Sequence, residues 1–152
     1  PGQRRAGDDP AGAALTPRRP PTMISYVTLG SDDPPRLARF YDAVLAPLGQ
    51  RRCHTDDTYV GWGPGGADDA PASLWLCRPF DGGRASVGNG TMVALYAVTR
   101  AQVHAVHAAA LTHGAHDEGA PGPRPHYGPH FYAAYFRDPE GHKIAVVCRA
   151  AR

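Results

Sequence analysis

Cysteine is scarce in this chain of 152 residues. The three cysteines, Cys53, Cys77 and Cys148, are an odd number, and no two of them form a Cys-x-x-Cys pair. A disulfide framework uses an even set of cysteines, and a structural zinc site uses closely spaced pairs. The sequence therefore favours neither, and we expect a protein of the reducing cytoplasm.

Long apolar runs are also missing. No stretch approaches the roughly 18 apolar residues of a membrane-spanning helix, and residues 1–22 lack the apolar segment of a secretory signal peptide. Leu15 is the only large aliphatic residue in that segment, which is rich in Pro, Gly, Ala and Arg. We therefore expect residues 1–22 to be a disordered extension, and we expect no membrane partner.

Net charge is low as well. Residues 1–22 contain four arginines and two aspartates, so this segment carries the whole formal net charge of +2. The rest of the chain is neutral, without a stripe of Lys and Arg and without aromatic residues interleaved with basic ones. Binding of nucleic-acid phosphates needs clustered positive charge. The composition thus argues against nucleic acid as a partner.

An internal repeat is the main feature that the chain does contain. The β-rich run 26–29 and the helix-like segment 34–48 recur, in the same hydrophobic register, as 92–95 and 99–113. A duplicated strand–helix unit predicts two equivalent modules that bury their helices against sheets. We therefore expect equivalent positions in the two halves to have equivalent roles.

Periodicity predicts the same order of elements in each half. Apolar residues at helical spacing mark the helices, and short β-rich runs between turns rich in Gly, Pro and Asp mark the strands. The predicted strands are 24–29, 51–55, 59–63, 73–77, 91–97, a weaker one near Ala115, 131–137 and 143–148. Each half is predicted to be a βαβββ module, at 23–80 and 91–149, with a linker at 81–90.

Several separated motifs resemble those of a known superfamily. Phe40-Tyr41 with Leu45 and Leu48-Gly49 is similar to its FYxxxLxxLG helix, and the run DPEGHKI at 138–144 is similar to its DPDGNxIE ending. The chain therefore resembles the vicinal oxygen chelate superfamily, which contains glyoxalase I, extradiol dioxygenases and bleomycin-type resistance proteins. The stretches 88–91, 125–127 and 132–134 further resemble a glyoxalase-like bacterial branch.

This resemblance implies a particular architecture. We expect an α+β fold in which two βαβββ modules form a curled mixed sheet around a pocket, with the helices on its outer face. The superfamily usually forms dimers, so the resemblance also implies a homodimer. Its modules pair either within one chain or between chains, and both arrangements stay open here.

Strand alternation assigns the two faces of the predicted sheets. Successive side chains in a strand point to opposite sides, so each sheet has two faces. One face is aliphatic throughout and should pack against helices. It comprises Val27, Leu29, Leu74, Leu76, Val93, Leu95, Ile144 and Val146. The opposite face carries Tyr26, Trp75, Met92, Tyr96 and Ala145. We expect that face to line the pocket.

In the superfamily the inner face holds a metal, with one His or Glu from the first and last strand of each module. Carried over to this sequence, the four positions are Tyr26, Trp75, Met92 and Ala145. None of these residues is a His or carries a carboxylate. Indole and methyl groups offer no lone pair to a metal, and a thioether is a soft, neutral ligand. The sequence therefore predicts that the usual metal site is absent, with no cofactor in its place.

Aromatic and sulfur-containing side chains remain on the inner face. They suit a planar apolar or cationic small molecule, as in a metal-independent resistance protein. The predicted ligand-binding residues are Tyr26, Trp62, Trp75, Met92, Tyr96, Arg124 and His130. In the alternative, these large side chains only fill the space of a lost metal and leave no pocket.

A loop rich in Gly and Pro, 119–129, contains the catalytic candidates His126 and Tyr127. Histidine can act as a general acid or base near neutral pH, and Arg124 could orient an anionic or phenolic group. The competing interpretation is a hydrogen bond that anchors the loop. Two enzyme hypotheses follow: a metal-free isomerase or lyase using His126 and Tyr127, or a metal-dependent lyase or dioxygenase with ligands relocated to His126, His130 and His142.

Overall fold

The computed structural model describes residues 23–65 and 71–151, so the predicted disordered extension lies outside the described residues. The N-terminal module contains β1 (Val27–Gly30), α1 (Pro34–Leu45), the short 3-10 helix η1 (Ala46–Leu48), β2 (Gln50–Thr55), β3 (Tyr59–Pro64) and β4 (Leu74–Cys77). The C-terminal module contains β5 (Val93–Ala97), α2 (Arg100–Thr112), β6 (His116–Pro123), the 3-10 helix η2 (Pro125–Tyr127), β7 (Tyr132–Arg137) and β8 (Lys143–Cys148). Neither helix of the described chain combines the length and apolar character needed to cross a membrane.

The described residues form two four-stranded mixed sheets, ordered β1-β4-β3-β2 and β5-β8-β7-β6. In each sheet the first two strands are parallel and the others antiparallel. The repeat extends to the register, since Val27 pairs with Leu74 in one sheet and Val93 pairs with Ile144 in the other. The predicted α+β fold of paired βαβββ modules is confirmed, and the sheets remain separate rather than closing into a barrel.

Local sequence signals define both helices. The side chain of Asp33 accepts a hydrogen bond from the backbone N–H of Arg36, and Gly49 ends the α1–η1 segment in a left-handed conformation with φ 72°. Such a φ favours glycine because a Cβ would be strained there. Thr99 and Gln102 form a reciprocal capping box at the start of α2, which satisfies backbone donors that have no partner within the helix.

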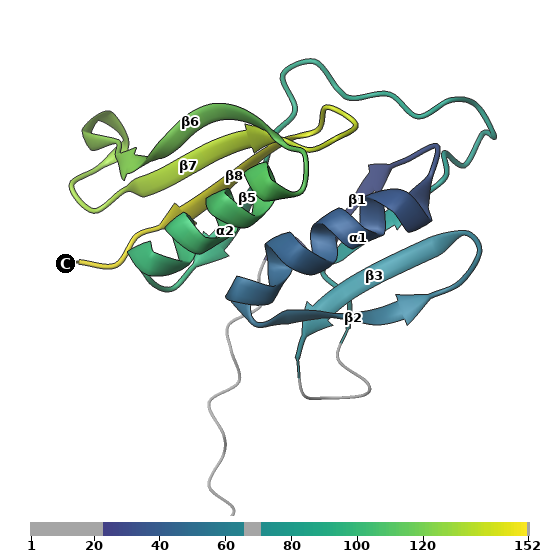
Figure 1. Ribbon diagram of the computed structural model, residues 1–152, viewed down its shortest axis with the longest axis horizontal. Helices are drawn as coiled ribbons and strands as arrows, with labels where there is room; N and C mark the ends of the chain where they lie inside the picture. The colour runs from purple at the N-terminus through teal and green to yellow at the C-terminus, as the bar shows by residue number, and fades with distance from the viewer. Residues whose placement is uncertain (1–22, 66–70, 152) are drawn as a thin grey trace, which may run out of the picture.

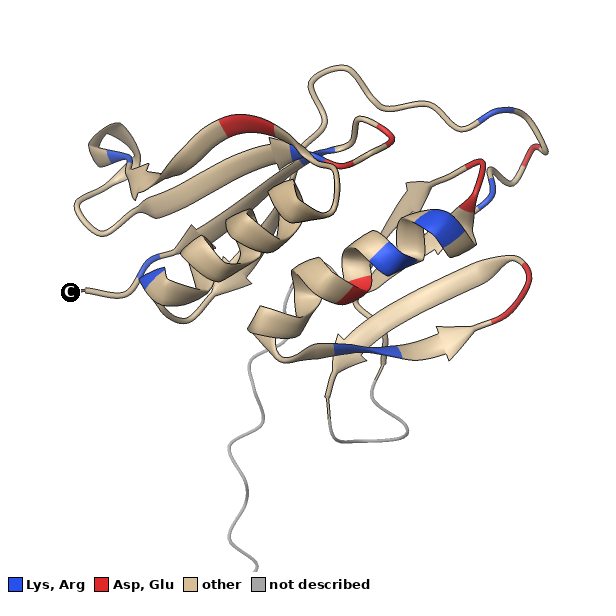
Figure 2. Ribbon diagram, viewed as in Figure 1, with Lys and Arg blue, Asp and Glu red and all other residues tan. Residues whose placement is uncertain are grey.

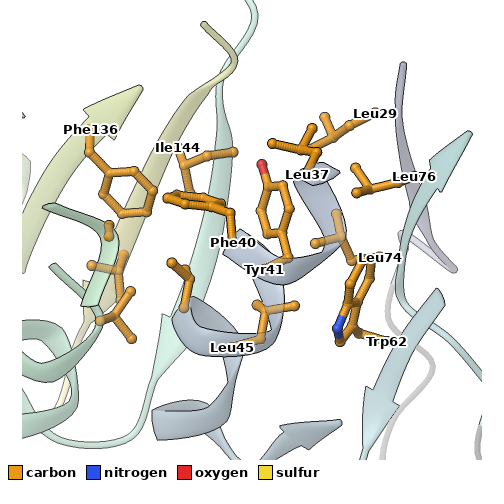
Figure 3. Packing of buried hydrophobic residues seen from close by; sticks show 14 of the residues in the cluster. Leu29, Leu37, Phe40, Tyr41, Leu45, Trp62, Leu74, Leu76, Phe136 and Ile144 are labelled. Atoms are coloured by element: carbon orange, nitrogen blue, oxygen red, sulfur yellow. The ribbon is translucent and has the colours of Figure 1, made fainter. Parts of the chain in front are cut away.

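One apolar core runs through both modules. The two helices contact each other, and Figure 1 shows them side by side with a sheet behind each. Phe40 of α1 lies next to Phe136 of β7 (Figure 3), and their ring centroids are 6.2 Å apart. The strand face predicted to be aliphatic packs on the helices in both sheets. The opposite face of each sheet is therefore left for other contacts.

The two sequence motifs of the superfamily meet between the modules. The hydroxyl of Tyr41 donates to Asp138 Oδ2 at 2.8 Å in a buried position. Ser31 Oγ donates to Glu140 Oε1 at 2.8 Å, and the ring nitrogen Nε2 of His142 lies 2.8 Å from the carbonyl oxygen of Gly30. The turn between β7 and β8 is thus fastened to the first module, and His142 belongs to that contact.

Candidate functional site

The open face of the C-terminal sheet carries a hollow of about 780 Å³. Ala145 and Val147 of β8 lie in its floor and pack with Ala133 of β7, so the floor consists of small apolar side chains. Every residue that lines the hollow lies between 92 and 149. The hollow therefore belongs to the C-terminal module alone.

Larger side chains form the walls of the hollow. Met92 precedes β5, and Tyr96 lies on β5 with 63% of its surface exposed. Tyr135 of β7 and the adjoining Phe131 line the hollow from the other strands. Tyr96 and Tyr135 lie on different strands of one sheet face, so the aromatic surfaces frame a space open to solvent.

The loop between β6 and β7 closes one end of the hollow. His126 and Tyr127 lie in η2 with ring centroids 4.1 Å apart, and Tyr127 packs 5.2 Å from Phe131. Both His126 and Tyr127 line the hollow. Within the described part of the chain, neither the imidazole of His126 nor the phenol of Tyr127 has a hydrogen-bond partner. The loop-anchoring hydrogen bond of the competing interpretation is therefore not formed by these side chains.

The structure therefore brings five of the predicted site residues together at this hollow: Met92, Tyr96, Arg124, His126 and Tyr127. It does not bring the remaining four there. His130 is exposed beside the loop and does not line the hollow. Tyr26 and Trp75 belong to the other module.

Trp75 lies across the open face of the N-terminal sheet. A Cβ placed on Gly61 would be only 2.7 Å from Cζ3 of Trp75, so the indole rests directly on the glycine. The rings of His54 and Tyr59 lie beside it, with centroids 5.4 and 6.3 Å away. On this sheet, large side chains fill the space that the inner face provides.

The structure corrects the expected position of Trp62. Alternation along β3 places Val60 and Trp62 on the face that packs on the helices, and Trp62 is only 1% exposed. Its indole N–H donates to Asp42 Oδ1 at 2.9 Å, and its ring lies 5.8 Å from that of Tyr41. Trp62 is therefore a core residue and does not line the open face (Figure 3).

Charged residues also border the hollow, and most were missed from the sequence. The predicted Arg124 is joined there by Glu118, Lys143 and Arg149. Figure 2 shows basic positions near η2, around the β7–β8 turn and next to the C-terminus, with an acidic stretch on β6. The Gly- and Pro-rich sequence of β6 gave only the weak strand predicted near Ala115 and left residues 119–123 in the predicted loop. Alternation along β7 could have identified Tyr135.

Glu118 is engaged by two cations. Nζ of Lys143 lies 2.9 Å from Oε2 of Glu118, and Nε of Arg137 donates to Oε1. The hydrogen bonds from Lys143 and Arg137, in that order, hold the pKa of Glu118 below its usual value. This carboxylate is therefore ionised at neutral pH and occupied by its own partners.

A comparison of the sequence with models of protein families shows the family of this chain. The model of a glyoxalase-like domain matches residues 26–147, which is most of the chain. The chain belongs to the glyoxalase-like domain family. A comparison with curated proteins finds no match.

Solved structures share the fold of this glyoxalase-like domain. A glyoxalase/bleomycin resistance protein from Albidiferax ferrireducens T118 is 30% identical, with a TM-score of 0.74 over 85% of this chain and 100% of that one. A lactoylglutathione lyase from Agrobacterium tumefaciens is 22% identical, with a TM-score of 0.58 over 85% of this chain and 95% of that one. The second similarity is evidence for the fold alone.

The residues at the metal-ligand positions of the superfamily do not fit a metal in this glyoxalase-like domain. Tyr26 and Met92 are exposed, Trp75 stacks over Gly61, and Ala145 lies in the floor without any donor atom. Borderline divalent metals are bound by imidazole, thiolate or carboxylate groups. Among the described residues no three His, Cys, Asp or Glu side chains gather where they could hold one ion.

The hypothesis of relocated metal ligands is not supported either. His142 is buried at the contact between the modules, where its ring nitrogen meets the Gly30 carbonyl. His126 lines the hollow and His130 is exposed outside it. The three histidines therefore lie in different parts of the fold and do not form one site.

Proposed function

We propose that this glyoxalase-like domain binds a planar small molecule in the hollow of its C-terminal sheet, without using a metal. The observation that carries the proposal is a hollow of about 780 Å³ with a floor of small apolar side chains and aromatic walls. Small-molecule pockets usually measure ~300–1,000 Å³ and combine apolar linings with a few polar groups. Stacking on Tyr96 would hold a flat ring.

The competing interpretation, in which large side chains leave no pocket, fits one module only. On the N-terminal sheet Trp75 covers Gly61, and its neighbours pack against it. On the C-terminal sheet the corresponding strand carries Ala145 and Val147, which leave space above them. The asymmetry supports a ligand site on the C-terminal sheet.

Ligand binding is best tested by a reporter placed in the hollow. Both native tryptophans lie in the N-terminal module, so Tyr96→Trp would supply a fluorescent group at the site. A panel of planar amphiphiles should quench this residue and raise the melting temperature of the native chain. Tyr96→Ala should weaken binding by roughly fivefold, since stacking on one ring contributes about 1 kcal/mol.

Tyr59→Ala provides the matched control, because Tyr59 is another exposed tyrosine but lies on the N-terminal sheet. It should leave the affinity unchanged. A broad panel in which no compound changes either the fluorescence or the melting temperature would contradict the proposal. So would ligands whose affinity falls equally in both variants.

A second candidate function is a metal-free isomerase or lyase reaction. It is favoured by the position of His126 and Tyr127, whose polar groups line the hollow without protein partners in the described residues. An unpartnered imidazole can take or give a proton to a bound ligand near neutral pH. His126→Ala should then abolish turnover while preserving binding, and retained turnover would rule His126 out.

Elemental analysis of protein purified without chelators tests metal independence for both candidates. The donor set argues that little metal will remain, because Trp75 and Ala145 cannot coordinate an ion. Near-stoichiometric nickel, zinc, iron or manganese would overturn the proposal. Activity that persists after metal removal would support the metal-free reaction.

We also propose a homodimer in which a second copy covers the open sheet faces. Large apolar side chains stay exposed on these faces, including Tyr26, Met92 and Tyr96. Contiguous exposed apolar surface commonly marks an interface. Sedimentation velocity should give twice the chain mass, and Tyr26→Asp should shift the equilibrium to monomer; a concentration-independent monomer would contradict this.

The state of the cysteines supports a cytoplasmic location. All three cysteines are free thiols, and Cys53 is exposed. Free exposed thiols persist in reducing compartments and oxidise readily elsewhere. Cell fractionation would test this placement.

A further inference from the structure

Two arginines lie at one end of the hollow. Arg124 lies between β6 and η2, and Arg149 directly follows β8. The register joins these ends, because Pro123 pairs with Tyr132 and Tyr132 pairs with Cys148. Both arginines line the hollow. Their backbones therefore lie at the same end of the hollow, and the guanidinium group of Arg124 folds back from there over the ring of Tyr135.

No carboxylate neutralises either guanidinium group within the described structure. The acidic side chain that lines the hollow, Glu118, is bound by Lys143 and Arg137. Arg137 and Lys143 pair with each other at the opposite end of the β7–β8 ladder. Glu118 therefore pairs with the cations at one end of the hollow, whereas Arg124 and Arg149 have no carboxylate partner in the described structure.

The fold holds Arg124 in place. Nη2 of Arg124 donates to the carbonyl oxygen of Ala120 at 2.9 Å, and Nη1 donates to that of Pro123 at 3.1 Å. A Cβ on Gly122 would lie 2.9 Å from Nη1, so this glycine leaves the space that the guanidinium occupies. The group also lies 5.5 Å over the ring of Tyr135. An arginine has five N–H donors, so Arg124 keeps three for a ligand.

Arg149 is positioned by stacking alone. Its guanidinium carbon lies 5.1 Å over the ring of Phe131, and no residue of the described chain accepts a hydrogen bond from its donors. Phe131 itself connects the two arginines, because its carbonyl oxygen accepts a hydrogen bond from the backbone N–H of Arg124. The guanidinium groups thus lie over two aromatic rings that line the hollow, Arg149 over Phe131 and Arg124 over Tyr135.

We propose that the ligand is a planar aromatic carboxylate, with its ring on the small-residue floor and its carboxylate group on Arg124 and Arg149. This inference rests on the ligand binding proposed above and names the chemical class of the ligand. A guanidinium fork matches the two oxygens of a carboxylate. A planar cation, which the aromatic walls alone would also suit, would meet charge of the same sign.

Three probes that share the naphthalene ring separate charge from shape. They are naphthalene-2-carboxylate, naphthalene-2-carboxamide and naphthalen-2-ylmethylammonium, titrated calorimetrically into the full chain at low and high salt. The carboxylate should bind about tenfold more tightly than the amide, because hydrogen bonds to a charged partner are the stronger ones. The ammonium compound should bind most weakly, and the advantage of the carboxylate should shrink in high salt.

Variants then locate the anion site. Arg149→Gln should reduce carboxylate affinity toward that of the amide and leave amide affinity unchanged. Arg124→Lys, which keeps the charge but loses the planar fork, should lose part of the preference. Arg39→Gln, an exposed arginine on α1, is the matched control and should change nothing. Melting curves of each variant verify that it is folded.

The outcomes distinguish this inference from the function on which it rests. Equal binding of carboxylate and amide would overturn the anion class and leave ligand binding standing. A carboxylate preference that survives in the Arg124→Gln/Arg149→Gln double variant would overturn the placement of the site. Absence of binding by all three probes would count against both the inference and the proposed pocket.

Discussion

The hydrogen bond between Tyr41 and Asp138 offers a sharp test of how the two modules are held together. The phenol donates to Oδ2 at 2.8 Å, with Tyr41 at 0% and Asp138 at 3% exposure. The other carboxylate oxygen, Oδ1, accepts from the backbone N–H groups of Glu140 and His142. Tyr41→Phe would therefore leave Oδ2 of a buried carboxylate without its phenol donor.

The magnitude follows from that geometry. A hydrogen bond to a charged group contributes about 1.5–3 kcal/mol, and a buried acceptor left unsatisfied loses the full amount. We expect Tyr41→Phe to lower the free energy of unfolding by about 2–3 kcal/mol. For a domain of this size the melting temperature should fall by roughly 6–10 °C. Urea titration and calorimetry would measure both quantities.

The same contact predicts a dependence on alkaline pH. Burial, followed by the charge of Asp138, raises the pKa of Tyr41 well above its usual value. In the unfolded chain the phenol ionises near pH ~10, whereas in the folded chain it remains protonated. The stability that this group contributes is complete below the unfolded pKa and falls as pH rises above it. Tyr41→Phe should remove this part of the alkaline decline.

Matched variants decide whether the reasoning is correct. Tyr96→Phe removes a hydroxyl from an exposed ring and should change stability by less than about 0.5 kcal/mol. A double-mutant cycle with Asp138→Asn should give a coupling energy of at least about 1 kcal/mol. If Tyr41→Phe costs no more than Tyr96→Phe, or the cycle shows no coupling, this contact does not fasten the modules.

Three further predictions concern other parts of the fold. Gly61→Ala should destabilise the chain by about 1–3 kcal/mol, because its Cβ would stand 2.7 Å from Trp75 Cζ3. Adding Trp75→Val to this variant should relieve the loss, and additive losses from the two substitutions would contradict the steric cause. Thr99→Ala should lower the free energy of unfolding by about 1 kcal/mol, because it removes the capping box of α2. Thr112→Ala at the other end of the helix is the control, and an equal loss of stability in both variants would argue against the cap. Hydrogen bonds from His54, then from the Tyr59 and Thr58 backbone, lower the pKa of Asp56 to about 2. The stability that Asp56 contributes is therefore complete above its unfolded pKa of ~3.9 and is lost as pH falls toward 2. In thermal melts, Asp56→Asn should show a shallower decline of stability in acid, and an unchanged decline would show that these hydrogen bonds contribute nothing.

The element order was predictable because the signals for it are local. Apolar residues at helical spacing, Gly49 and the capping residues Asp33 and Thr99 lie within a few positions of the structure that they define. Period-two alternation likewise identified the aliphatic face of β1, β4, β5 and β8. Trp62 was misplaced because its aromatic side chain suits a pocket, although Val60 two positions earlier places it on the aliphatic face.

The sequence by itself determined the duplicated βαβββ units, the family to which they belong and the residue types at the four positions where the resemblance places metal ligands. Each of these depends only on residue type and short-range spacing. The tertiary structure alone decided that Trp75 covers one sheet while small residues leave the other open. It also decided that Arg124 and Arg149 line the same hollow. Those outcomes depend on which strand ends the register brings together, and long-range pairing of that kind leaves no signature in local sequence.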